Sequence, residues 1–234
     1  MLFNILQSGD IKSALIQMLL VIPVLLLSFS VHESAHGLVA YWLGDPTARN
    51  LGRLTLNPFK HLDLFGTLSM LLVGVGWAKP VPIHARYFKK PKLGMALSAL
   101  AGPVSNFLLA FLAVICQQLT FLVANHTLTA ASQEDTAVVA FSVVLSFFYN
   151  MAWMNISLGI FNLIPVPPFD GSRIAFALLP DRFYWGVMRY ERYIMIGMIV
   201  LFFGLNRLGF NFIGGITELV YGVLNLLTYW ITLL

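Results

Sequence analysis

The chain has 234 residues, of which 59% are hydrophobic and 10% are charged, and its formal net charge is +4. Soluble domains carry about 25% charged residues, so this composition excludes an ordinary soluble protein and indicates one built for lipid. The basic residues fall in loops beside apolar spans rather than on one soluble face, which also excludes a nucleic-acid partner.

The first apolar segment, about residues 11–43, is long enough for a membrane helix. A cleavable signal peptide has an apolar core of roughly 7–15 residues followed by a small-residue cleavage site. Here the mostly apolar character continues to Trp42 without such a site. We therefore expect this helix to be retained in the mature protein.

The next segment, residues 44–92, is not a plain linker. "RLTLNPF" alternates polar and apolar residues, and "AKPVPIHARYF" is held extended by its prolines. The apolar piece between them, residues 62–75, is too short to cross a bilayer. This pattern predicts a re-entrant or interfacial β-hairpin, which is tolerated at membrane depth only where protein or a water-filled cavity covers it.

Further membrane spans follow in the second half of the chain. Residues 93–124 and 137–164 are clear spans, while 193–205 and 210–234 could be two short spans or one broken one. We therefore expect an all-α polytopic membrane protein, a bundle of about four to six membrane segments with the β-hairpin after the first helix. No linker composition or repeat divides it, so residues 1–234 are expected to form a single integral membrane domain.

The distribution of Lys and Arg predicts the orientation. The 44–92 segment has eight of them, the 125–136 loop has none, and the 165–192 segment has four. By the positive-inside rule the first and third of these are cytoplasmic and the middle one is external. The protein is then expected in the cell (plasma or inner) membrane, multi-pass, with its N-terminus external and the end of the first helix at the cytoplasmic face.

A metal-binding pattern, "HESAH", lies near that cytoplasmic end. His32 and His36 are four residues apart, so they share one helix face and can reach one ion, with Glu33 beside them as a general base. Three ionisable groups at membrane depth indicate a functional site. The alternative is that they are polar residues of a helix–helix contact. His36 lies about 10 Å from the helix end, which predicts an active site near the cytoplasmic face.

A catalytic zinc ion needs a third protein ligand. In "NLIPVPPFDGSR" the prolines prevent helix, and Asp170 follows the span that returns to the cytoplasmic side. We predict Asp170 as the third ligand to one Zn²⁺ per chain, the alternative being an Asp-Gly turn at the membrane surface. Glu218 is a competing ligand, whereas His61 and His84 are expected to be solvated or interfacial.

The amide of Asn106, in "ALAGPVSNFLLAF", is the remaining candidate. In apolar surroundings it would either hydrogen-bond across helices or hold substrate and support a developing oxyanion. The residues leave both roles open.

Together, "HESAH", "AGPVSNF" and "NLIPVPPFDGSR" resemble the site-2 protease family of intramembrane zinc metalloproteases. "RLTLNPFKHLDLFGTLSMLL" and "GWAKPVPI" are similar to its compact prokaryotic branch. The resemblance implies zinc ligands His32, His36 and Asp170, the catalytic base Glu33, and Asn106 as a substrate-binding residue. Many relatives carry a PDZ domain where this chain has only residues 125–136, and "DGS" replaces the more frequent "DGG".

The predicted function is zinc-dependent hydrolysis of peptide bonds within or near transmembrane segments, in regulated intramembrane proteolysis or the clearance of membrane peptides. The expected partners are a transmembrane-segment peptide and the lipid bilayer; the oligomeric state and the substrate's identity stay open. One alternative is another membrane zinc peptidase that uses Glu218 as third ligand. The other is a non-catalytic metal-binding membrane protein.

Overall fold

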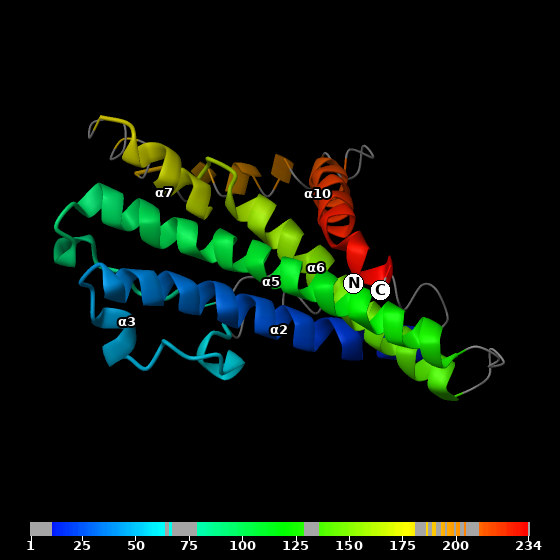
Figure 1. Ribbon diagram of the computed structural model, residues 1–234. Helices are drawn as coiled ribbons and strands as arrows, with labels where there is room; N and C mark the ends of the chain where they lie inside the picture. Colours follow the sequence, from blue (N-terminus) through cyan, green and yellow to red (C-terminus); the bar gives the residue numbers. More distant parts are fainter. Residues whose placement is uncertain are drawn as a thin grey trace.

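Helices account for nearly all the regular structure of the described residues. The computed structural model describes residues 11–63, 66, 79–128, 136–180 and 211–233, with 186, 189–190, 193–194, 196–198, 200–201 and 204. The long helices are α2 (Ile11–Trp42), α5 (Pro91–Thr127), α6 (Thr136–Asn162) and α10 (Phe212–Thr228), and α10 runs into the 3₁₀ helix η3 (Tyr229–Leu233). Helix α5 packs against α2, α6 and the short α7 (Asp170–Ala177), and Figure 1 shows it between α2 and α7.

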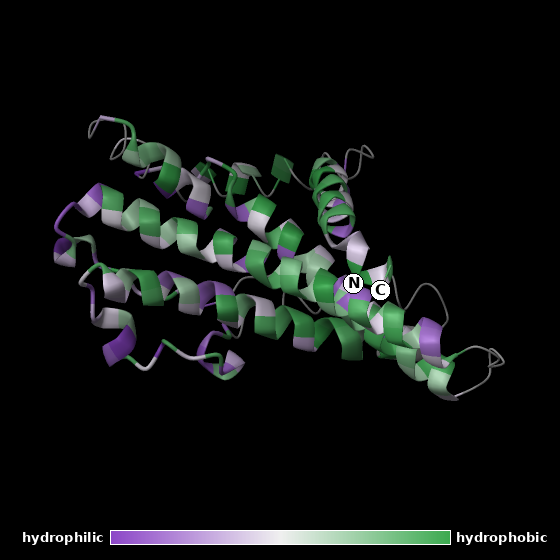
Figure 2. Cartoon of the chain, viewed as in Figure 1, coloured by the Kyte–Doolittle hydropathy of each residue, from purple (hydrophilic) through white to green (hydrophobic). Residues whose placement is uncertain are grey.

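Four described helices are long and apolar enough to cross a bilayer, at 16–42, 91–127, 136–162 and 212–233. Their outward faces carry large apolar side chains, such as Leu108, which is 60% exposed, and Leu219, which is 69% exposed. Figure 2 shows mostly hydrophobic colour on α5, α6 and α10, interrupted by a few hydrophilic bands. Such exposure is expected where lipid surrounds the helices, and the chain is an integral membrane protein.

The three predicted core helices are confirmed with small changes of boundary. The segments expected at 11–43, 93–124 and 137–164 are helical at 11–42, 91–127 and 136–162. Helix α5 begins with Pro91 in its first turn, where the missing N–H costs nothing. Of the two predicted C-terminal segments, 210–234 contains α10 and η3, and 193–205 lies partly outside the described residues.

Small side chains on α5 allow its neighbours to approach closely. The residues that α5 buries are almost all small: Gly94, Ala96, Ser98, Ala99, Gly102, Pro103, Asn106, Ala110, Ala113, Val114 and Ala124. In a membrane, where water does not drive helices together, close packing of this kind is a main source of association. The backbone carbonyl of Ser98 and the side-chain amide of Asn106 face the α2 histidines.

The predicted β-hairpin at 44–92 is not seen. Within the described part of that segment the elements are short helices, α3 (Thr47–Asn50), η1 (Pro58–Lys60) and η2 (Ala85–Tyr87), and Leu62 is an isolated β-bridge residue. Residues 64–65 and 67–78 lie outside the described residues. The two described parts on either side of these residues, 44–63 and 79–92, are in contact, since Lys79 N–H donates to the His61 carbonyl over 2.8 Å.

Asp45 joins the start of this segment to its later part through hydrogen bonds to its carboxylate. The carboxylate is fully buried and accepts hydrogen bonds from Thr47 N–H (2.9 Å), from the Thr47 hydroxyl (2.5 Å) and from His84 N–H (2.6 Å). Burial alone would raise the pKa of Asp45, but these hydrogen bonds outweigh it and hold the pKa below its usual value. The C-terminal end of α2 is thereby joined to the segment that follows residue 79.

The chain between α6 and α7 turns back toward α5. After Asn162 the three prolines end the helix, as expected, and α7 begins at Asp170. Gly171 packs so closely that a Cβ there would lie 2.6 Å from the Ile164 carbonyl oxygen. The departure from "DGG" is accommodated because the Ser172 hydroxyl donates to the Phe169 carbonyl over 2.7 Å.

Candidate metal centre

His32 and His36 face each other from successive turns of α2. Their Nε2 atoms are 2.9 Å apart and their ring planes are perpendicular, with centroids separated by 4.5 Å. Both residues are buried, at 5% and 7% exposure. The four-residue spacing therefore produces the paired arrangement that the sequence predicted.

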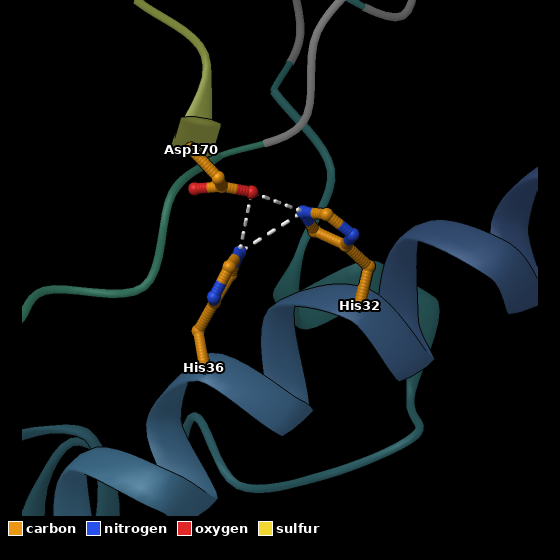
Figure 3. A group of neighbouring side chains, drawn as sticks. All are labelled: His32, His36 and Asp170. Atoms are coloured by element: carbon orange, nitrogen blue, oxygen red, sulfur yellow. Dashed lines mark hydrogen bonds and ion pairs between the residues drawn. The ribbon is translucent and has the colours of Figure 1, made fainter. Parts of the chain in front are cut away.

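Asp170 completes the group from the far side of the bundle. Its Oδ2 atom lies 3.2 Å from His32 Nε2 and 3.2 Å from His36 Nε2 (Figure 3). Asp170 is the first residue of α7, and the tight packing of Gly171 against the end of α6 is what directs this carboxylate at α2. Within the described residues these three form the cluster of His, Cys, Asp and Glu that could hold a metal ion.

The outer ring nitrogens are held by acceptors on α5. His36 Nδ1–H donates to the Ser98 carbonyl over 2.7 Å, and His32 Nδ1–H donates to Asn106 Oδ1 over 2.5 Å. A neutral imidazole carries one proton, so a proton on Nδ1 leaves a lone pair on Nε2. Both inward-facing nitrogens are therefore acceptors.

Three lone-pair atoms thus converge on one point, and a divalent cation fits them. Asp170 Oδ2 is buried and accepts no hydrogen bond from the described residues. Ligand atoms at about 2.0–2.1 Å from a tetrahedral zinc ion lie about 3.3 Å from one another. The observed separations of 2.9 and 3.2 Å are close to that value.

Gly102 of α5 lies directly against the two imidazoles. A Cβ at this position would lie 2.5 Å from His36 Nε2 and 2.6 Å from His32 Cε1. Such separations are well inside van der Waals contact, so any larger residue would push the rings out of place. The absence of a side chain at Gly102 is therefore a requirement of the site's geometry.

Glu33 lies beside the cluster and is engaged by an extended segment. Its Oε2 accepts a hydrogen bond from Val81 N–H over 2.8 Å. Arg53, which is 8% exposed, holds that segment by donating from Nη2 to the carbonyls of Lys79 (2.7 Å) and Pro80 (3.1 Å). The backbone of residues 79–81 is thereby held next to the acidic group of the motif.

Comparison with known proteins agrees with this geometry. Residues 20–205 match the family described as peptidase family M50. The chain belongs to peptidase family M50. "Putative zinc metalloprotease YwhC" of Bacillus subtilis (strain 168) is 46% identical over 180 residues, 76% of this chain and 77% of the relative. "Putative zinc metalloprotease Rip2" of Mycobacterium tuberculosis (strain ATCC 25618 / H37Rv) is 26% identical over 199 residues, 82% and 70% of the two chains. No solved structure matches significantly.

This membership confirms the resemblance to the site-2 protease family. The M50 chain is a zinc metalloprotease, hence a hydrolase, with a peptide substrate and a membrane setting. The metal ion of this family is therefore zinc. Two imidazoles and one carboxylate are a donor set that suits a zinc ion.

Asn106 of this M50 protease is fully buried and uses both ends of its amide. Oδ1 accepts from His32, and Nδ2 donates to Asn155 Oδ1 over 2.8 Å. The sequence left two roles open for Asn106, and these contacts correspond to the first of them, a hydrogen bond between helices. Substrate binding by Asn106 stays a prediction.

The structure also places two of the weaker candidates. Glu218, the competing ligand, is exposed on α10 and outside the metal-binding cluster. His61, expected to be solvated, is 1% exposed, with Nε2 2.8 Å from the Thr55 carbonyl.

Sequence reasoning missed Asn155 and Arg53. Asn155 is an amide within the apolar run of α6, which is the signal that singled out Asn106 and that could equally have found it. Arg53 gave no such signal, because basic residues are common in the loops beside membrane helices.

Proposed function

We propose that this M50 protease is an intramembrane endopeptidase that hydrolyses peptide bonds within or near transmembrane segments of membrane proteins. In this proposal His32, His36 and Asp170 hold one Zn²⁺ and Glu33 is the catalytic base. Asn106 fixes the centre from α5 and is a candidate for contact with substrate. Residues 1–234 act as one integral membrane domain.

The convergence of three buried lone-pair atoms carries the proposal. His32 Nε2, His36 Nε2 and Asp170 Oδ2 lie within 3.2 Å of one another on two helices far apart in sequence. Without a cation such an arrangement is repulsive, because each atom offers a lone pair and none a proton. A helix–helix contact of ordinary polar residues would pair donors with acceptors.

The chemistry divides between the ion and Glu33. A zinc ion held by His32, His36 and Asp170 would supply Lewis acidity to a water molecule and to the scissile carbonyl. Glu33 would take a proton from the attacking water and deliver it to the leaving amine. Its Oε2 is oriented by Val81 N–H, and its second oxygen can receive the proton.

A helical substrate must unwind before it is cut, since each of its carbonyls is bonded to an amide four residues on. We propose that an arm of the 44–92 segment captures it by strand addition. The Ser34 hydroxyl donates to the Thr55 carbonyl over 2.7 Å, which supports a position for that arm beside the "HESAH" helix.

The substitution Leu56→Pro removes one backbone N–H from this arm. We expect it to slow cleavage while the zinc content of the protein stays unchanged. Equal rates for Leu56→Pro and Leu56→Ala would contradict capture through this arm.

The proposed orientation follows the basic loops. His36 lies six residues before the end of α2, about 9 Å along the helix. With the N-terminus external, the centre is then inside the bilayer but close to the cytoplasmic face of the plasma or inner membrane.

Glu33→Gln tests the proposal, because the amide oxygen can still accept from Val81 N–H. We expect unchanged zinc content and a fall of about 10²–10⁴-fold in cleavage of a membrane-spanning test peptide. Glu218→Gln, which alters an exposed glutamate on α10, is the matched control and should cleave at the wild-type rate.

Each alternative outcome has a definite meaning. Full cleavage by Glu33→Gln would remove Glu33 from the reaction. Zinc binding by a wild-type protein that cleaves no membrane-spanning peptide would favour a metal-binding protein without this activity.

A further inference from the structure

A row of buried polar side chains lies behind His32 and joins three helices. Asn106 on α5, Asn155 on α6 and Ser28 on α2 are each at most 1% exposed. Asn106 Nδ2 donates to Asn155 Oδ1 over 2.8 Å, and Asn155 Nδ2 donates to Ser28 Oγ over 2.8 Å. Buried polar groups are costly unless each is satisfied, and in this row each one is bonded to the next.

Two backbone carbonyls fix the direction of every bond in the row. Asn155 Nδ2 also donates to the Met151 carbonyl over 2.8 Å, and the Ser28 hydroxyl donates to the Val24 carbonyl over 2.7 Å. A carbonyl can only accept, so the Asn155 nitrogen must face Met151 and Ser28. Its oxygen must then face Asn106.

The same constraint passes on to the metal centre. Because the Asn155 oxygen is an acceptor, the Asn106 nitrogen turns toward it and the Asn106 oxygen faces His32 Nδ1, 2.5 Å away. That oxygen requires the proton of the imidazole to be on Nδ1. The lone pair is therefore on Nε2, the atom directed at Asp170.

We propose that Asn155 is a positioning residue of the metal centre. Acting through Asn106, and anchored by Ser28 and the Met151 carbonyl, it fixes both the tautomer and the orientation of His32. The proposal rests on the proposed function, because the tautomer matters only if His32 binds zinc through Nε2. Hydrogen-bond partners one step removed from the metal typically affect its affinity about 10- to 100-fold.

A role in helix packing alone predicts a different result. Asn150, also on α6, donates from Nδ2 to the Ser146 carbonyl of its own helix over 2.7 Å. It resembles Asn155 in residue type, helix and local bond, but this hydrogen bond stays within α6. Asn150→Leu is therefore the matched control for Asn155→Leu.

The test is a double-mutant cycle on zinc affinity, measured on the full chain in detergent by competition with a chelator. We expect Asn155→Leu and Asn106→Leu each to weaken zinc binding about 10- to 100-fold. The double variant should lose no more than the worse single variant, because both act on His32 through one path. The absorption bands of Co²⁺ substituted at the site should shift in Asn155→Leu and not in Asn150→Leu.

The proposal would be overturned if the double variant lost zinc affinity by the product of the two single losses. It would also be overturned if Asn155→Leu bound zinc with wild-type affinity. If Asn155→Leu does not fold, Ser28→Ala is the smaller change, and undiminished zinc affinity in that variant would overturn it equally. His32→Ala separates the two claims. Retention of full zinc affinity there would defeat the proposed metal site itself, whereas its loss beside an unaffected Asn155→Leu would defeat only the role of Asn155.

Discussion

At the scale of single residues, the two histidines owe their geometry to groups on another helix. His32 and His36 donate from Nδ1 to Asn106 and to the Ser98 carbonyl, and both acceptors belong to α5. Spacing along α2 predicts that the rings share a face, because that is a local property of a helix. It cannot predict which acceptors orient them, because those come from tertiary packing.

Asp45 shows the same dependence on tertiary partners outside the membrane spans. Its hydrogen bonds hold the carboxyl pKa below the usual value despite burial. A lowered folded-state pKa contributes stability above the unfolded value, about 3.9, and that contribution is lost as the pH falls through the folded value.

We therefore expect Asp45→Ala to lower the free energy of unfolding by about 2–3 kcal/mol at pH 7, the worth of hydrogen bonds to a buried charge. Thermal unfolding in detergent, followed from pH 7 to below pH 4, measures it. The difference from wild type should shrink at the acidic end. A difference independent of pH would contradict this account of Asp45.

At the scale of elements, the contact between α2 and α5 brings the two imidazoles against the backbone of α5. Gly102 leaves no room for a Cβ beside either ring. A glycine in a membrane helix permits a close approach but does not show which neighbour makes it, so the contact with the histidine pair could not be predicted from the sequence.

Gly102→Ala should weaken zinc binding about 5- to 150-fold, because overpacking a tight contact costs about 1–3 kcal/mol. The matched control is Gly222→Ala on α10, where a Cβ would meet no described atom within 4 Å. Alanine there should retain full zinc affinity and stabilise the helix by up to about 1 kcal/mol. Equal zinc affinities for the two variants, measured by chelator competition, would contradict the role given to Gly102.

The sequence predicted the long helices well but not the structure of the 44–92 segment. Apolar runs of membrane length leave a chain little choice but helix, so α2, α5 and α6 were predicted within a few residues. The alternation in "RLTLNPF" is short, and local bonds compete with it. Asn57 Oδ1 accepts from Phe59 N–H over 3.1 Å and caps η1 at Pro58. His61 is buried by contacts that no local pattern encodes.

At the scale of the whole molecule, the candidate centre is assembled from α2, α5, α6 and α7. Counting basic loops brought Asp170 to the same side of the membrane as His36, which is why the sequence could pair them. The bonds through Asn155 depend on how α6 lies against α5 and α2, and no charge count or spacing reports that.

Zinc content of the purified protein, compared between Asp170→Ala and Glu218→Ala, tests the central claim most directly. If two imidazoles and the Asp170 carboxylate hold the ion, Asp170→Ala should lose zinc and Glu218→Ala should retain one ion per chain. Retention of zinc by Asp170→Ala together with its loss from Glu218→Ala would contradict the account.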